Sequence, residues 1–142
     1  MDTYDWLLFL HLLAAAMAVA GVVMYWALYA ATDPAAAPDG GRATPVLGLA
    51  PLADILWAVG GVGVLVLGIG LAIQVDAYKV WDAWVLAAIV LWAIASESGR
   101  RVGQGYRGLR NGTGSRESIL MHVVVALAVL ALLVDMIYKP GA

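Results

Sequence analysis

The chain contains two histidines, His11 and His122, and both lie within long apolar stretches, residues 6–31 and 119–134. An imidazole in hydrocarbon is unfavourable unless another group bonds to it, so histidines inside membrane-length segments are candidates for binding or proton transfer. For His11 the pattern allows an axial ligand of haem b, a metal ligand, a proton relay or a structural bond to a neighbouring helix. For His122, near the start of its helix, a structural role is favoured over cofactor binding.

Two carboxylates are candidate partners of these imidazoles. Asp135 has nearly the same predicted membrane depth as His11, and a carboxylate there would fix the imidazole tautomer. The alternative for Asp135 is that its side chain reaches the membrane surface near Lys139. Asp54 is expected on the same membrane face as His122 and is the candidate partner of that ring.

Met121 adds a soft sulfur ligand beside His122. Thioether and imidazole groups suit Cu(I), so His11, Met121 and His122 form a candidate metal set, and copper or proton movement that uses the histidines and Met residues is an alternative. A single haem held by both histidines of one chain is not expected, because their predicted depths differ by roughly 12 Å, given a rise of 1.5 Å per residue and a core of about 30 Å. No catalytic residue is predicted, since no serine lies beside a histidine within a span.

The composition predicts a membrane protein of one domain, residues 1–142. Hydrophobic residues make up 63% of the chain and charged residues 13%, a balance that would expose large apolar patches in water. The net charge of −2 gives no basic surface for a nucleic acid. The absence of cysteine excludes disulfides, thiolate metal sites and thiol nucleophiles. The acidic start and the length of the first apolar stretch predict a retained helix rather than a cleaved signal.

Four membrane spans are predicted, at about residues 5–31, 52–74, 80–98 and 117–138, because roughly 20 apolar residues cross the hydrocarbon core as a helix. We therefore expect an all-α, antiparallel bundle of four transmembrane helices. Proline and glycine predict loops over residues 32–51 and 99–116.

The distribution of basic residues predicts the direction of insertion. The segment 99–116 holds five arginines, and the positive-inside rule places such a segment in the cytoplasm. Both termini then face outward, in what we expect to be a bacterial cytoplasmic membrane. Aromatic side chains are expected to anchor the helices at the two membrane surfaces: Trp6, Trp26, Trp57, Trp81, Trp84 and Tyr138.

Glycines in the second span predict close helix packing. Gly60, Gly63 and Gly70 share one helix face, and Gly61 and Gly68 share a neighbouring one. Small residues allow helix backbones to approach in lipid, which favours association within the chain or with another chain. Two further residues mark helix starts: Pro51 suits the first turn of the second helix and Ser115 is a predicted N-cap of the fourth.

Several strings along nearly the whole chain resemble a family of small four-helix integral membrane proteins of unknown function. They are Leu10-His11, Ala53-Asp54 before the glycine-rich stretch 60–70, Trp81 with Trp84-Val85, Glu97-Ser98-Gly99-Arg100, and the tail Asp135-Met136-Ile137-Tyr138-Lys139-Pro140-Gly141. That family is distantly similar to CopD-type copper-resistance membrane proteins and to haem-binding membrane protoporphyrinogen oxidases. The similarity implies His11 as a haem ligand, but those oxidases also use a lysine within the bundle, and no predicted span here contains one.

Two classes of function follow from these features. The first is a non-enzymatic accessory or scaffold bundle that packs with itself or with a larger membrane complex. The second is a redox protein that binds haem b through His11. Copper or proton transfer through His11 and His122 is a third alternative.

Overall fold

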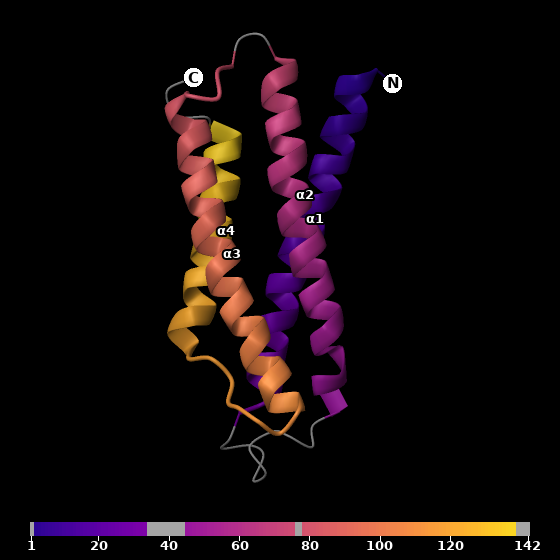
Figure 1. Cartoon of the computed structure of the whole chain (residues 1–142), viewed down its shortest axis with the longest axis vertical. Coiled ribbons are helices and arrows are strands. Elements are labelled where there is room, and N and C mark those ends of the chain that lie inside the picture. Colours follow the sequence, from indigo (N-terminus) through magenta and orange to yellow (C-terminus); the bar gives the residue numbers. More distant parts are fainter. Residues whose placement is uncertain (1, 34–44, 76–77, 139–142) are drawn as a thin grey trace.

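The computed structural model describes residues 2–33, 45–75 and 78–138. It contains four long helices, α1 (Thr3–Ala31), α2 (Ala50–Gln74), α3 (Ala83–Arg110) and α4 (Ile119–Tyr138), and a short 3₁₀ helix, η1 (Pro45–Leu49). Successive helices run in opposite directions, so the first and last described residues lie at the same end (Figure 1). The predicted all-α antiparallel four-helix bundle is confirmed.

All four helices are long and apolar enough to cross a membrane. Large apolar side chains cover the outward faces of the bundle, as Val66 on α2 and Leu130 on α4 show, with 60% and 58% of their surface exposed. Such faces need hydrocarbon around them because in water they would drive aggregation. The chain is a multi-pass membrane protein.

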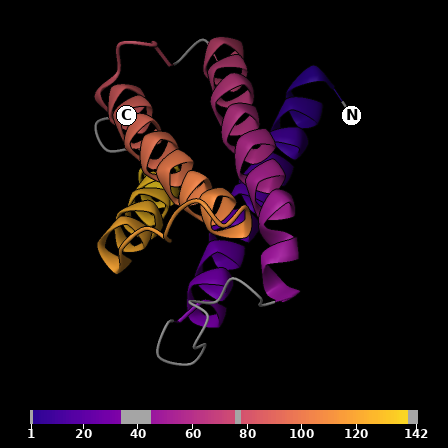
Figure 2. The ribbon, with the colours of Figure 1, turned by 60° about the horizontal axis from the view of Figure 1, so that its bottom comes forward.

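The helices form two hairpins, α1 with α2 and α3 with α4. Within each hairpin the helices pack along much of their length, whereas between the hairpins the close contacts concentrate toward the end opposite the termini. Figure 2 shows the two pairs diverging toward the end that carries both termini. The bundle is therefore tight at one end and splayed at the other.

The α1–α2 hairpin is held by the predicted glycine face. A Cβ atom on Gly60 would lie 2.8 Å from the Ala14 carbonyl oxygen and 2.9 Å from the Ala18 Cα, and one on Gly63 would lie 2.8 Å from the Ala14 Cβ. Distances this short leave no room for a side chain, so the absence of one lets the two backbones touch. The glycine packing predicted from the sequence takes place here between helices of the same chain.

Trp57 joins the two hairpins. Its backbone packs on Gly21 of α1, where a Cβ atom would lie 3.0 Å from the Trp57 nitrogen, and its indole ring lies directly on Gly99 of α3. The prediction that Trp57 and Trp84 anchor the membrane surface is wrong, since only 9% and 6% of their surface is exposed. Trp6 is 53% exposed, as an interfacial anchor would be.

Helix α3 extends about three turns beyond its predicted end. Most of the predicted loop 99–116 is helical, up to Arg110, and only the segment after it connects to α4. The glycines there do not break the helix because they provide packing surface, and arginines occupy the exposed positions. Buried positions recur every three or four residues, as expected for one helix face: Ala95, Ser98, Gly99, Val102, Gly103, Tyr106 and Leu109.

The helix starts agree in part with the sequence. Pro51 lies in the first turn of α2 as predicted. The predicted Ser115 cap is wrong, because α4 begins at Ile119 and the first turn is closed instead by the Ser118 carbonyl oxygen, which accepts from the Met121 nitrogen at 3.1 Å. The start of α1 has a capping box between Asp2 and Asp5, which sequence analysis did not single out.

A Gly60→Ala substitution tests the α1–α2 contact. The added methyl group would meet the Ala18 backbone, so the helices must separate, and we expect a loss of about 1–3 kcal/mol in stability. Thermal unfolding in detergent micelles, followed by circular dichroism, measures the effect. Gly61→Ala is the matched control, since a Cβ atom there has no neighbour within 4 Å. Equal stability of the two variants would contradict this packing.

Candidate functional site

The two histidines lie at opposite ends of the bundle. His11 is beside Gly68 of α2, whereas the His122 ring packs 4.7 Å from the ring of Tyr29. Tyr29 is eighteen residues beyond His11 on the same helix, which corresponds to about 27 Å along the axis at 1.5 Å per residue. One cofactor cannot contact both imidazoles within this chain, so the candidate copper set of His11, Met121 and His122 is not brought together.

His11 lies in the splayed half of the bundle. A Cβ atom on Gly68 would be 3.1 Å from the His11 Cε1 and 3.7 Å from the terminal methyl of Met136. Side chains of α1 and α4 therefore meet at Gly68 of α2. The His11 ring interacts with the backbone of Val64, which acts as a weak hydrogen-bond acceptor for the imidazole. Its Nδ1 atom is buried and makes no hydrogen bond of ordinary distance and angle among the described residues. In a membrane such an atom is a vacant bonding position.

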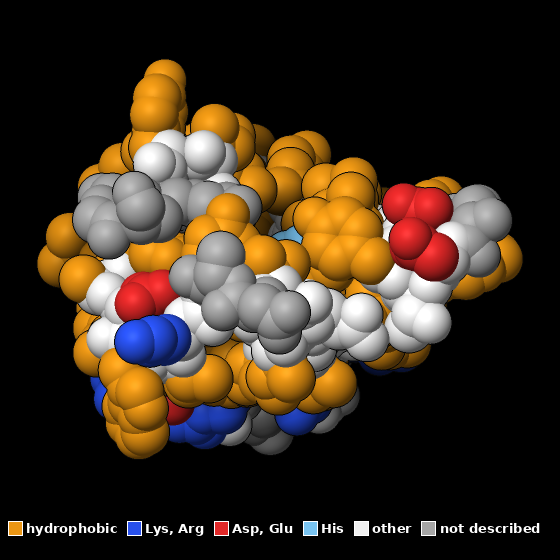
Figure 3. All heavy atoms as spheres, turned by 90° about the horizontal axis from the view of Figure 1, so that it is seen from above, with side chains coloured by type: hydrophobic (Ala, Val, Ile, Leu, Met, Phe, Trp, Pro, Cys, Tyr) orange, Lys and Arg blue, Asp and Glu red, His pale blue; other side chains and the backbone are white. Residues whose placement is uncertain are grey.

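A cleft of about 380 Å³ separates the two hairpins and is bordered by His11. Its volume falls within the range of small-molecule pockets. All four helices contribute to its walls, which are mostly aliphatic and aromatic. Figure 3, seen from the end that carries both termini, shows a histidine side chain between apolar side chains. The wall includes Tyr4, Ala15, Val19, Gly61, Gly68, Trp92, Ser96 and Met136.

The hydrogen bond predicted between His11 and Asp135 does not form. The Asp135 side chain is buried, with 8% of the residue surface exposed, and its Oδ2 atom, like His11 Nδ1, has no partner in the described part of the chain. The alternative contact with Lys139 lies outside the described residues. Asp135 precedes Met136, whose side chain lines the cleft.

His122 has both ring nitrogens engaged. Its Nδ1 is 2.9 Å from the Ser118 carbonyl oxygen, and its Nε2 is 2.7 Å from the Tyr106 hydroxyl. A carbonyl oxygen only accepts, so Nδ1 carries the hydrogen and, in the neutral ring, Nε2 accepts from Tyr106. This arrangement leaves no nitrogen for a metal or haem iron, and it gives His122 the structural role favoured by the sequence.

Aromatic rings surround His122 at the closed end of the bundle. Trp26 and Tyr29 of α1 lie 5.7 and 4.7 Å from its ring centre, and Tyr106 of α3 lies 5.6 Å away. Arg116 stacks on the Tyr29 ring at 4.0 Å and donates to the Tyr29 carbonyl oxygen. Met121 packs against this core as an apolar side chain.

Asp54 lies at the same end as His122, but the predicted partnership between the two side chains does not form. Asp54 accepts from the Tyr25 hydroxyl at 2.8 Å and from Arg107 at 3.1 Å. Tyr106 lies between the two groups, since its hydroxyl is 3.1 Å from the Tyr25 carbonyl oxygen and 2.7 Å from His122 Nε2. Its single hydrogen is shared between these two acceptors when the His122 ring is neutral. Gly103 leaves the space for the pair of Tyr25 and Asp54, because a Cβ atom there would be 3.0 Å from the Tyr25 hydroxyl and would overlap the Asp54 carboxylate.

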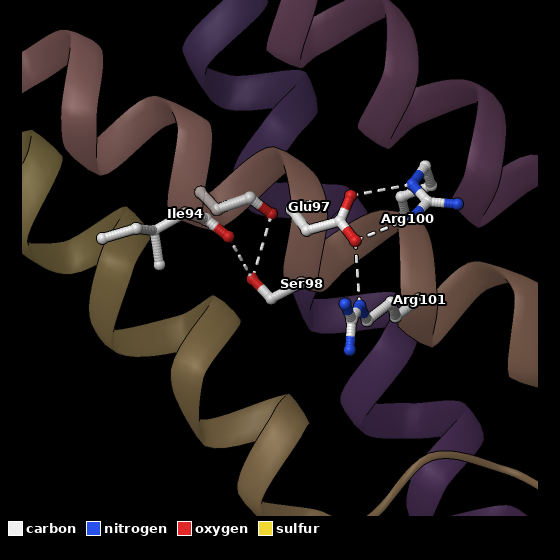
Figure 4. Close-up of polar contacts among 6 residues, drawn as sticks. Ile94, Glu97, Ser98, Arg100 and Arg101 are labelled. Carbon is white, nitrogen blue, oxygen red and sulfur yellow. Dashed lines mark hydrogen bonds and ion pairs between the residues drawn. The ribbon is translucent and has the colours of Figure 1, made fainter.

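Arginines near the middle of α3 are paired on its surface. Glu97 accepts from Arg100 at 2.7 Å and from Arg101 at 2.9 Å (Figure 4). Glu97 is therefore shared by two arginines, one three and the other four residues further along α3. The adjacent Ser98 is buried, and its hydroxyl donates to the Ile94 carbonyl oxygen at 2.6 Å (Figure 4). Both ion pairs are exposed, so they add little stability.

No family model, curated protein or solved structure matches the chain. The site is therefore defined by its own geometry: an apolar cleft beside His11 at the splayed end, and a polar aromatic cluster around His122 at the closed end. Sequence analysis missed Tyr25, Tyr106 and Met136. The only sequence signal for Tyr106 is that it falls on the same helix face as the other buried residues of α3.

Replacing Tyr106 by phenylalanine tests the cluster around His122. The variant removes the hydroxyl that bonds to His122 Nε2, and we expect a loss of about 1–3 kcal/mol, the cost of a buried group left without a partner. Thermal unfolding in detergent measures it. Tyr29→Phe is the control, because the Tyr29 ring contacts His122 and no hydrogen bond of its hydroxyl is found in the described ranges. Equal melting temperatures would argue against the bond.

Proposed function

We propose that the protein binds an apolar ligand within the membrane, in the cleft between its hairpins, and that His11 provides the polar contact. One observation carries this proposal: an imidazole with an unsatisfied Nδ1 borders an apolar cleft of about 380 Å³. Concave, mostly apolar pockets with a few polar groups are the usual form of ligand sites. A bundle needed only for packing has no use for an unsatisfied imidazole in hydrocarbon.

Haem b is the occupant that the family resemblance implies, and the site meets its needs in part. His11 offers the imidazole that an axial ligand requires, and Met136 offers a thioether nearby. Haem b also carries two propionates, and none of the described cleft residues is a lysine or arginine. The residues present therefore do not fit the whole cofactor, and haem b remains a second candidate that measurement separates from the first.

The accessory or scaffold role remains a proposal with less support. It was based on glycine faces able to pack against other proteins, and two of those glycines, Gly60 and Gly63, pack against α1 of the same chain. If the purified protein carries no ligand and migrates with a larger complex, this role is favoured over ligand binding.

Ligand binding is tested by comparing wild-type protein with His11→Leu, both purified from membranes in mild detergent. We expect the wild type to retain a bound molecule, detected by its absorption spectrum or by mass spectrometry of an organic extract. His11→Leu should retain at least tenfold less, because the polar contact is gone. Leu13→Val, on the exposed side of α1, is the control and should behave as wild type. A wild-type protein without any bound molecule would refute the proposal.

We also propose that the protein lies in a bacterial cytoplasmic membrane with both termini outside and the arginine-rich end of α3 in the cytoplasm. The support is that the arginines of α3 all belong to its C-terminal half, and α3 ends at the end of the bundle away from the termini (Figure 1).

Single cysteines test this orientation directly, because the chain has none of its own. We expect Thr3→Cys to react with a membrane-impermeant maleimide in intact cells and Thr113→Cys to react only after the membrane is permeabilised. Both positions are exposed. The reverse pattern of labelling would show that the arginine-rich end faces outward.

A further inference from the structure

We infer that the ligand of the cleft is an uncharged lipid with a single extended chain, whose polar end carries a carbonyl or hydroxyl oxygen. This inference rests on the proposed function and specifies the ligand class. It follows from three properties of the cleft: its charge, its shape and its polar group.

The first property is the absence of charge from the described wall. None of the residues that border the cleft in the described ranges is Asp, Glu, Lys or Arg. An ion taken from water into hydrocarbon is strongly destabilised unless an opposite charge compensates it. The cleft therefore discriminates against phosphates and carboxylates, including phospholipid headgroups and haem propionates, and favours a neutral molecule.

The second property is the elongated form of the cleft. On α1 its wall runs from Tyr4 to Val19, which corresponds to about 22 Å along the helix axis. The wall is therefore elongated along the helix. An extended hydrocarbon chain matches an elongated apolar wall. Small residues, Ala15 and Gly61, widen the wall only locally.

The third property is a polar side chain, His11, on the α1 wall. His11 lies about halfway along the wall, and its buried Nδ1 atom has no hydrogen-bond partner in the described part of the chain. An imidazole nitrogen bonds to a carbonyl oxygen as a donor, or to a hydroxyl group in either role. Trp92 is not available, since its indole donates to the Gly61 carbonyl oxygen at 2.8 Å.

Gly61→Leu provides the sharpest test of this inference. Gly61 borders the cleft, and a Cβ atom there has no neighbour within 4 Å, so a leucine projects into open space without a clash at its base. Val66→Leu is the matched control on the same helix, because Val66 is 60% exposed on the outer face. Circular dichroism confirms that both variants retain the helical fold.

The experiment compares organic extracts of the three full-length proteins by mass spectrometry in both ion modes, with lipid amounts expressed per protein. We expect one neutral, oxygen-containing, single-chain lipid in wild type and Val66→Leu, and at least tenfold less in Gly61→Leu. A short-chain benzoquinone with one alkyl tail serves as a direct probe. It should quench tryptophan fluorescence saturably in lipid-depleted wild type and at least tenfold more weakly in Gly61→Leu.

The outcomes separate this inference from the proposed function. A bound molecule that is charged, such as haem b or a phospholipid, and that is lost in Gly61→Leu would overturn the inference and leave ligand binding in the cleft intact. Equal amounts of neutral lipid in wild type and Gly61→Leu would mean adventitious lipid only and would overturn the inference. The absence of any bound molecule, with no saturable quenching, would overturn both.

Discussion

The contact of Trp57 with two glycines determines the shape of the bundle. Its backbone rests on Gly21 of α1 and its indole ring on Gly99 of α3, so one large residue joins both hairpins at a single level. Dispersion forces and close packing drive helix association in lipid, where no hydrophobic effect separates helix from solvent. Toward one end from this level, the helices close around tyrosines and His122. Toward the other, they diverge and leave the cleft beside His11.

Buried polar side chains differ between the two ends of the bundle in whether they have hydrogen-bond partners. At the closed end the imidazole and the carboxylate both have partners: His122 bonds to Tyr106 and to a backbone carbonyl, and Asp54 bonds to Tyr25 and Arg107. At the splayed end His11 Nδ1 and Asp135 Oδ2 have none in the described part of the chain. In hydrocarbon, unsatisfied groups are costly and tend to mark function. This contrast places the candidate site at His11 rather than at His122.

The sequence predicted the four helices because apolar length is a strong signal in a membrane protein. It also predicted that His11 and His122 lie at different depths. It failed for the end of α3, where glycine was taken as a helix breaker although Gly99 and Gly103 occupy packing positions. The cluster around His122 could not be predicted from the sequence, because Tyr25 and Tyr106 are 81 residues apart and no local pattern links them. The cleft leaves no sequence pattern, because it arises from the angle between hairpins.

The bond from the Trp92 indole to the Gly61 carbonyl oxygen has a consequence for how the hairpins move. It joins α3 to α2 about one turn from Trp57, on the side toward the splayed end. Spreading the hairpins further would break this bond and leave the indole N–H without an acceptor in hydrocarbon, whereas the Gly61 carbonyl oxygen keeps its backbone bond within α2. The bond therefore opposes a wider angle between the hairpins.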